Sequence, residues 1–313
     1  MRSINPSCWS EHDELDIVMV CKPTELSIPN LQLAAEVQWN APVHHEKAQE
    51  NFRNLTIALK SEGIRVIDYS DLLSQEDQQL SRQLINRFFV RDLACVFGEQ
   101  IVPGVAGTFM RAPEYDMAHR LMERSFARDT FVKWDDDAHH PLEFGDVLVL
   151  NKDAVLINAG LRTSIEGIYK VKDDLFQAGF SEIGVMNLPR RTDTLHLDMN
   201  CNVAGDGIVV AKIFMRHFPV KVLTKGTVRY GMFADFLKQH GFEVHWLERY
   251  NTIPDINFLN LSPDTILISQ NADQSLLKSH PMLQHKRIIS IDVTELEKAG
   301  GGIRCMTLPL KRK

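Results

Sequence analysis

The feature that most constrains the fold of this chain is a short pattern that recurs along it. In each copy a leucine precedes a glycine by four residues, and an apolar stretch typical of a strand follows the glycine. The pattern occurs at residues 59–63, 175–179, 237–241 and 296–300. Because glycine adopts the left-handed backbone conformation at little steric cost, it is well suited to end a helix. The pattern therefore predicts four helices that each end at a glycine.

The spacing of these glycines indicates a repeated unit. The three intervals between them are 116, 62 and 59 residues long. The first interval is about twice the others, which indicates five units, one of which has lost the pattern. We place the helix of this degenerate unit at residues 113–128, where Met117, Leu121 and Met122 are apolar and no glycine ends the segment.

The first unit shows what each unit is expected to contain. A short apolar strand at 17–20 precedes an amphipathic helix, whose apolar residues recur between 48 and 59 at helical spacing, and a second strand follows at 64–69. No linker rich in proline or serine interrupts the chain. We therefore predict an α/β protein whose residues 1–313 form one domain, in which residues 1–15 are a loosely ordered N-terminal segment.

Composition excludes several classes of function. Lysine and arginine number 35 against 41 acidic residues, a formal charge of −6, which disfavours nucleic acid as a partner. No apolar run approaches the roughly 18 residues that span a bilayer, and the N-terminus is too polar for a secretory signal. The five cysteines are scattered and form no C-x-x-C motif. We predict a cytoplasmic protein that binds no membrane, with a small-molecule substrate and one cysteine as a candidate nucleophile.

Three consecutive glycines near the C-terminus single out that cysteine. The stretch 299–307 reads Ala-Gly-Gly-Gly-Ile-Arg-Cys-Met-Thr, and we expect Cys305 to lie on a short apolar strand. A glycine run weakens regular structure, so it favours a place where the backbone turns sharply or approaches a ligand. The alternative is that Cys305 is a small buried apolar residue, as most free cysteines are. The glycines favour the reactive interpretation.

Acidic residues and a histidine supply the remaining candidates. We predict a strand at 195–199, on which His196 and Asp198 share a face. Two carboxylates in the stretch 143–146 and one in 86–92 each precede an apolar run. Each of these groups alone could be a solvent-exposed ion pair or a polar strand end. Together they indicate acid–base chemistry near the ends of the strands.

These residue types suit one kind of substrate. A free thiol has a pKa of about 8.5, and a cation placed over it would favour the nucleophilic thiolate. Carboxylates would hold that cation, each contributing on the order of 4 kcal/mol at about 4 Å and an effective dielectric constant near 20, before desolvation. Planar, bidentate pairing with carboxylates is typical of a guanidinium group. The combination therefore points to guanidine chemistry.

The ordered motifs resemble a known family. N-x-x-F-x-R-D at 86–92, E-x-G-D at 143–146, H-x-D at 196–198 and G-G-G-x-x-C at 300–305 resemble the arginine deiminase branch of the guanidino-group modifying superfamily. The resemblance runs from about residue 33 to the end. It implies the pentein fold, a single-domain α/β propeller of five ββαβ-type modules around a pseudo-fivefold axis, which agrees with the repeat.

The resemblance also implies roles for individual residues. Cys305 would attack the guanidinium carbon, His196 would act as general acid and then base, and Glu143 would orient His196. Asp92 and Asp198 would grip the guanidinium nitrogens. The implied intermediate is a covalent amidino-thioether, hydrolysed to a ureido product with no metal or organic cofactor. The residues implied to contact the rest of the substrate are Asn86, Phe89, Arg111, Asp146 and Arg162.

Several positions depart from the family pattern. Phe144 replaces a glycine of the usual E-G-G-D, and Gly300 stands where such enzymes commonly have an arginine. Arg304 is no simple replacement, because on a strand it would point away from Cys305. The stretch 73–86 leaves no room for the helical insertion of typical bacterial arginine deiminases. The reaction type is therefore better supported than free arginine as the substrate.

Four functions remain open at this stage. A deiminase would use water as the second nucleophile, whereas an amidinotransferase would pass the amidino group to an amine. A dihydrolase would carry arginine through to ornithine, and Asp92 argues against it because we expect such enzymes to differ at this position. A degenerate binding protein is disfavoured by the retention of every catalytic residue type. The oligomeric state is also open, with a homo-oligomer among the options.

Overall fold

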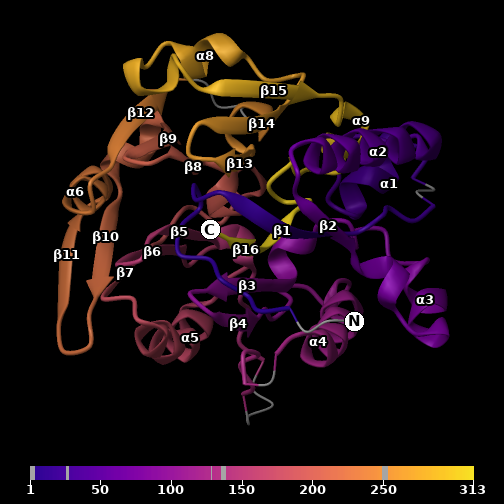
Figure 1. The fold of residues 1–313 in the computed structure, drawn as a ribbon, viewed down its shortest axis with the longest axis horizontal. Coiled ribbons are helices and arrows are strands. Elements are labelled where there is room, and N and C mark those ends of the chain that lie inside the picture. Colours follow the sequence, from indigo (N-terminus) through magenta and orange to yellow (C-terminus); the bar gives the residue numbers. More distant parts are fainter. Residues whose placement is uncertain (1–3, 26–27, 128, 135–138, 249–252) are drawn as a thin grey trace.

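The structure is a computed structural model that describes residues 4–25, 28–127, 129–134, 139–248 and 253–313. It is a mixed α/β fold in which helices lie outside several small sheets (Figure 1). No helix in the described ranges is both long and apolar enough to cross a membrane. The helices are α1 (Leu31–Glu36), α2 (His45–Ser61), α3 (Gln75–Ser81), α4 (Ala112–Ser125), α5 (Ile165–Ala178), α6 (Phe233–Gln239), α7 (Ile253–Ile256), α8 (Gln274–Lys278) and α9 (Thr294–Glu297).

Short strands alternate with these helices and with single turns of 3₁₀-helix. The strands are β1 (Leu15–Val20), β2 (Arg65–Asp68), β3 (Ala94–Phe97), β4 (Gln100–Pro103), β5 (Val147–Asn151), β6 (Ala154–Asn158), β7 (Glu182–Met186), β8 (Cys201–Gly205), β9 (Ile208–Lys212), β10 (Pro219–Leu223), β11 (Val228–Met232), β12 (Glu243–Leu247), β13 (Leu259–Ser262), β14 (Thr265–Ser269), β15 (Arg287–Ile291) and β16 (Leu308–Arg312). The 3₁₀ turns are η1 (Tyr69–Leu72), η2 (Val90–Leu93), η3 (Phe144–Asp146), η4 (Thr192–Thr194), η5 (Leu197–Met199), η6 (Ile213–His217) and η7 (Pro281–Leu283).

One pairing pattern recurs among the sheets of the described residues. β5 and β6 pair antiparallel, and β7 returns through α5 to pair parallel with β6. The same arrangement joins β8, β9 and β12, then β13, β14 and β15, and also β16, β1 and β2. β3 and β4 pair antiparallel, and their parallel neighbour is a single bridge between Ile101 and Phe131. β10 and β11 extend the sheet of β5, β6 and β7.

The left-handed conformation predicted for the four glycines is confirmed, although α9 ends at Glu297, three residues before Gly300. The four glycines of the sequence pattern all have left-handed backbone conformations, with φ of +78° at Gly63, +119° at Gly179, +88° at Gly241 and +101° at Gly300. In α5 the N–H of Gly179 donates to the carbonyl of Leu175, which closes the last turn as the pattern predicts. Glycine is needed here because a Cβ would strain the backbone at these angles.

The helix expected in the degenerate unit is present as α4, which spans Ala112–Ser125. Its predicted end, Arg128, lies outside the described residues. Met117 and Met122 are buried, and proline stands in the first turn, where its missing N–H has no cost.

The N-terminal segment differs from the sequence prediction. From residue 4 onward it packs into the fold: Cys8 exchanges backbone hydrogen bonds of 2.8 Å with Gly98, and Glu11 is buried against Arg304. A segment rich in polar residues becomes ordered here because its polar groups pair with buried groups elsewhere, which sequence polarity does not reveal.

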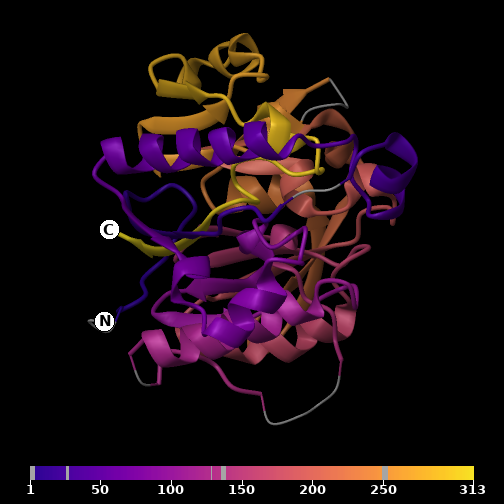
Figure 2. The same ribbon diagram turned by 90° about the vertical axis from the view of Figure 1, so that its right-hand side faces the viewer.

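α2 has the amphipathic face expected for the first unit. Ala48, Phe52, Leu55 and Leu59 are buried, in one apolar cluster with Val18 of β1. In Figure 2 this helix crosses the view, with the C-terminal sheets above it, and the N- and C-terminal ends lie on the same side.

Candidate active site

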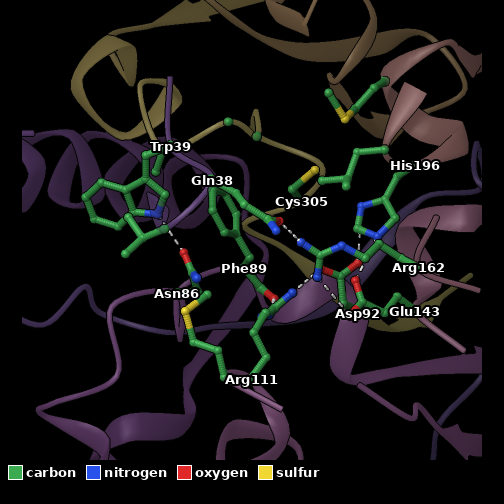
Figure 3. A pocket seen from close by; sticks show the side chains of 17 residues that line it. Gln38, Trp39, Asn86, Phe89, Asp92, Arg111, Glu143, Arg162, His196 and Cys305 are labelled. Carbon is green, nitrogen blue, oxygen red and sulfur yellow. Dashed lines mark hydrogen bonds and ion pairs between the residues drawn. The ribbon is translucent and has the colours of Figure 1, made fainter. Parts of the chain in front are cut away.

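Three of the 3₁₀ turns bring the predicted residues together. η2, η3 and η5 each immediately precede the first strand of a sheet, respectively β3, β5 and β8. With residues 37–39 and 299–305 they surround a cavity of about 60 Å³ (Figure 3). Most of the predicted site residues line it, and they are Asn86, Phe89, Asp92, Arg111, Glu143, Arg162, His196 and Cys305. Asp146 and Asp198 lie behind the lining.

Two predicted strands are turns in the structure. The stretch around His196 and Asp198 is the 3₁₀ turn η5 with an extended residue before it, and Cys305 lies in a turn that precedes β16. The predictions of a strand at 195–199 and of a strand at Cys305 were therefore wrong. Apolar alternation alone did not distinguish a strand from a turn whose apolar side chains are buried in the core.

The thiol of Cys305 is enclosed by polar neighbours. Asn257 Nδ2 donates to its sulfur at 3.1 Å, and Asn257 Oδ1 accepts from its backbone N–H at 3.0 Å. The sulfur lies 3.5 Å from Asp198 Oδ2. Burial, together with the nearby carboxylates of Asp198 and Asp92, raises the pKa of the Cys305 thiol well above its usual value. The thiol of Cys305 is therefore protonated near neutral pH.

The glycine run allows the backbone to pass this close to the thiol. A Cβ at Gly301 would lie 2.6 Å from Phe89 Cε1 and 3.2 Å from the sulfur of Cys305. A Cβ at Gly302 would lie 2.8 Å from Asn257 Cβ. These contacts are closer than side chains tolerate, so the close approach expected from the sequence is present.

His196 is held between two carboxylates. Its Nε2 forms a 2.9 Å hydrogen bond with Glu143 Oε2, while Nδ1 lies 3.9 Å from Asp92 Oδ1. A Cβ at Gly145 would lie 2.6 Å from Nδ1, so this position requires glycine. Phe144 is buried in the neighbouring apolar core and does not fill the cavity. The bulk at position 144 is thus compatible with the site.

These charges determine the protonation of His196. Burial by itself lowers the pKa of His196, but Asp92, Glu143 and Asp146 outweigh it and raise the value to about 10. For Glu143, burial raises the pKa. The hydrogen bond and charge of His196, together with the charges of Arg111 and Arg162, outweigh burial and lower this pKa to about 2. His196 is therefore an imidazolium beside a carboxylate at neutral pH, ready to donate a proton.

Asp198 is anchored by an arginine behind the cavity. Arg304 Nη1 donates to Asp198 Oδ2 at 2.8 Å, and Arg304 Nη2 donates to Glu11 Oε1 at 2.8 Å and to the carbonyl of Val147 at 2.7 Å. Asp198 Oδ1 is buried without a hydrogen-bond partner. Arg304 points away from the cavity, as expected, but it orients a predicted substrate ligand.

Asp92 is occupied by a different arginine. Arg111 Nη1 donates to Asp92 Oδ2 at 2.6 Å, and the N–H of Gly145 donates to Asp92 Oδ1 at 2.9 Å. Arg111 also donates to Glu114 Oε2 at 2.9 Å and to the carbonyl of Phe89 at 2.8 Å. Arg111 lines the cavity, so an arginine of the chain itself stands where a guanidinium ligand of Asp92 would bind.

Three site residues were missed by the sequence analysis. Gln38 accepts a hydrogen bond from Arg162 Nη2, although its own backbone has φ of +64°, and Trp39 Nε1 donates to Asn86 Oδ1 at 2.8 Å. Asn257 holds the thiol from a position 48 residues away. None of them belongs to a motif, and no local signal in the sequence distinguishes them from ordinary loop residues.

Asp146, predicted to contact substrate, lies behind the cavity lining and is hydrogen-bonded within the scaffold. Its Oδ1 accepts from Asn158 Nδ2 at 2.7 Å and from the N–H of Leu197 at 3.0 Å, which fixes the turn that presents His196. Burial raises the pKa of Asp146 to about 7.

Asp92, Glu143 and His196 are close enough to share a metal ion, since their ligand atoms lie within 4.8 Å of one another. Asp92 and Glu143 are already neutralised by Arg111, Arg162 and His196. A divalent cation would have to compete with these cations, whereas the same cluster fits proton transfer as it stands.

The chain is similar in sequence to known proteins. The arginine deiminase family model matches residues 74–312. The uncharacterized protein YkgA of Bacillus subtilis (strain 168) is 24% identical over 309 residues, covering 97% of this chain and 95% of that protein. An arginine deiminase of Bacillus cytotoxicus is 26% identical over 270 residues, covering 73% of this chain and 62% of that enzyme.

The fold is shared with a solved structure. A cysteine-to-serine mutant of DDAH from Pseudomonas aeruginosa, complexed with citrulline, superposes with a TM-score of 0.68. The sequences are 16% identical, and the superposition covers 94% of this chain and 99% of that one.

Proposed function

The chain belongs to the arginine deiminase family, hydrolases that act on guanidino C–N bonds, and we propose that it is a cysteine-dependent hydrolase of arginine or an arginine derivative. The products are ammonia and a ureido compound. The observation that carries the proposal is the convergence of Cys305, His196 and Glu143 with two aspartates around one cavity.

Substrate binding is the step that activates the thiol. A guanidinium between Asp92 and Asp198 places positive charge beside the sulfur and neutralises the carboxylates that raise the pKa of Cys305. Asp198 Oδ1 has no hydrogen-bond partner among the described residues and is proposed to accept from a guanidinium N–H. The thiol proton passes to solvent as the cationic substrate binds, so thiolate forms when the substrate is present and the nucleophile is protected from solvent oxidants between turnovers.

Bond making then follows from the positions of the groups. The thiolate attacks the guanidinium carbon, and the His196 imidazolium gives its proton to the departing nitrogen, which leaves as ammonia. The amidino carbon remains bound to the sulfur of Cys305 as a thioether. Glu143 holds Nε2, so Nδ1 is the nitrogen that exchanges the proton.

Water completes the cycle. Neutral His196 takes a proton from water, and the hydroxide adds to the amidino carbon. The carbon–sulfur bond then breaks, and the hydroxyl proton passes to the departing sulfur, which releases the ureido product and restores the thiol. Phe89, Asn86, Arg111 and Arg162 line the remainder of the cavity and are proposed to hold the rest of the substrate. Asp146 acts as a positioning residue for the turn that carries His196.

Binding of a substrate carboxylate requires Arg111 to change partners. In the structure its guanidinium is bound to Asp92 and Glu114. A substrate that brings both a guanidinium and a carboxylate would satisfy Asp92 with the first and Arg111 with the second. This exchange keeps every buried charge paired and therefore avoids an isolated buried ion.

We further propose that residues 1–313 form one catalytic domain. This domain is a propeller of five modules around a pseudo-fivefold axis, without a helical insertion. The repeated strand pairing and the convergence of η2, η3 and η5 on one cavity support it. We also propose a cytoplasmic enzyme, which is supported by five free cysteines.

The test is ammonia release from the purified protein. L-arginine, agmatine, methylated arginines and arginine-containing peptides are each assayed with and without glycine or ornithine. Cys305→Ser is the blank, and Cys95→Ser, which removes a buried thiol outside the cavity, is the matched control. Amine-independent ammonia that is lost only in Cys305→Ser supports the deiminase.

Other outcomes redirect the assignment. Turnover that depends on an added amine identifies an amidinotransferase, and ornithine with a second ammonia identifies a dihydrolase. Ammonia release by Cys305→Ser at the native rate would refute the covalent mechanism.

A further inference from the structure

β11 (Val228–Met232) forms an edge of the five-stranded sheet, and its outer side has no neighbour among the described residues. Figure 1 shows it at the left margin of the molecule, paired on its inner side with β10. An unprotected edge pairs readily with another strand, and proteins usually block such edges with lysine, proline or a bulge. β11 contains neither residue, and its register with β10 is uninterrupted.

The pairing with β10 determines which backbone groups of β11 point outward. In an antiparallel pair, opposite residues alternate between hydrogen-bonded and non-bonded pairs. Directly after the strand, the N–H of Phe233 donates to the carbonyl of Phe218. Counting back in steps of two, the residues of β11 that bond inward to β10 are Gly231 and Arg229. The other three residues of the strand direct their N–H and C=O groups away from β10.

Those three residues also expose apolar side chains. Tyr230 is 73% exposed, Val228 57% and Met232 40%. They share one face of the strand, because side chains at alternate positions point the same way. Tyr169 of α5, 40% exposed, extends this face through a 2.7 Å hydrogen bond from Lys221 on β10.

The charged residue of the strand does not guard the edge. Arg229 Nη2 donates to Glu182 Oε2 at 2.8 Å, which draws the guanidinium back over its own sheet toward β7. The outer edge thus combines unpaired backbone groups with apolar side chains. The lysine that shares this face, Lys221, lies one strand inward, opposite Tyr230, and donates to Tyr169.

We propose that β11 pairs antiparallel with β11 of a second copy of this chain, about a two-fold axis at Tyr230. The two Tyr230 residues face each other and exchange N–H to C=O hydrogen bonds, as the outward direction of their backbone groups requires. Val228 faces Met232 of the second copy, so apolar residues meet. Arg229 faces Gly231 of the second copy, so no like charges meet. The two sheets become one continuous sheet in a closed dimer.

The first test is the oligomeric state of the full-length protein by sedimentation velocity and light scattering. We expect a dimer at tens of micromolar. Tyr230→Lys places two ammonium groups at the axis and is expected to raise the dimer dissociation constant at least 10-fold. Phe109→Lys, which replaces an aromatic residue that is 86% exposed and lies outside β11, is the matched control and is expected to leave it unchanged.

A cross-link tests the register. Opposite Cα atoms in a hydrogen-bonded antiparallel pair are about 5.5 Å apart, which is within disulfide range. The native cysteines are all buried, so Tyr230→Cys adds the exposed thiol. Mild oxidation should yield a covalent dimer from Tyr230→Cys and none from Phe109→Cys, with far-ultraviolet circular dichroism verifying the fold of each variant.

Three results would overturn the proposal. These are a monomeric wild-type protein at 100 micromolar, a dimer that Tyr230→Lys weakens no more than Phe109→Lys does, or equal cross-linking of the two cysteine variants. A negative result here leaves the ammonia assay unaffected, because β11 does not line the catalytic cavity.

Discussion

Asp92 and Asp198 flank the same thiol and each binds an arginine, yet the two pairs differ. Asp198 receives Arg304 on one oxygen and leaves the other without a partner. Asp92 has both oxygens engaged, one by Arg111 and one by a backbone N–H. Of the two aspartates, Asp92 lines the cavity with both oxygens engaged, whereas Asp198 keeps one oxygen without a partner but lies behind the cavity lining.

The surroundings of the two arginines explain the difference. Arg304 is 1% exposed and is also bound by Glu11 and a backbone carbonyl, so it belongs to the core. Arg111 faces the cavity, and its second partner is Glu114. Burial raises the pKa of Glu114 to about 6, even though Arg111 opposes this shift. Arg304 thus orients Asp198, the proposed guanidinium ligand, whereas Arg111 is the arginine that the proposed substrate would displace from Asp92.

Removal of the core arginine should have the largest effect. Arg304→Met leaves the carboxylates of Glu11 and Asp198 buried without their partner, which costs about 3–5 kcal/mol of folding free energy. Arg111→Met should cost less, because Glu114 can take up a proton and the cavity can admit water to Asp92. Urea denaturation of both variants at pH 7 measures the difference. Equal losses of unfolding free energy in the two variants would contradict the difference proposed between the Asp198–Arg304 and Asp92–Arg111 pairs.

Arg111 should instead control substrate affinity. Arg111→Met should lower kcat/KM for L-arginine roughly 30- to 150-fold, because a charged partner of the substrate carboxylate is lost. This factor corresponds to a loss of about 2–3 kcal/mol in transition-state stabilisation. Agmatine lacks that carboxylate, so its kcat/KM should stay the same or rise as Asp92 becomes available. Steady-state assays of both compounds provide the measurement, and parallel losses would contradict the exchange of partners.

The carboxylates around His196 should make stability depend on pH. The pKa of His196 is raised to about 10 in the folded protein, above the usual value of about 6.5. Its stabilising contribution is complete below pH 6.5 and falls by up to about 1.4 kcal/mol per pH unit as pH rises toward 10.

Unfolding free energies of the wild type and His196→Phe between pH 6 and 10 measure this contribution. Asp92→Asn removes one of the charges that raise the pKa of His196. It should therefore lower the pH at which the stabilising contribution of His196 is fully lost. A difference between wild type and His196→Phe that stays constant across the range would rule out a raised pKa.

The smallest effect is expected for the aspartate that holds the scaffold. Asp146→Asn keeps the oxygen that accepts from Asn158 and Leu197, so we expect stability to change by less than about 1 kcal/mol and KM to stay constant. The pKa of His196 should fall slightly, since one nearby charge is lost. A histidine NMR titration with matched kinetics tests this, and a large rise in KM would restore Asp146 as a substrate contact.

Local features of this protein were readable from its sequence. The left-handed conformation of the four glycines follows from the conformational freedom of a residue without Cβ, and α2 follows from apolar spacing. The candidate cysteine, histidine and carboxylates lay within short motifs, because chemistry restricts which residue types can do the work. Motif order was enough to place most of them around one cavity.

Contacts between distant parts of the chain were not readable in this way. Asn257 meets Cys305, Gln38 meets Arg162, and Glu11 meets Arg304 across 293 residues. These pairings depend on how separate sheets pack, and no local pattern encodes that packing. For the same reason the turns at His196 and Cys305 were mistaken for strands, and the N-terminal segment for a loose one. Short motifs in the sequence identified the candidate reacting groups, whereas the packing of the sheets determined which arginine binds each aspartate.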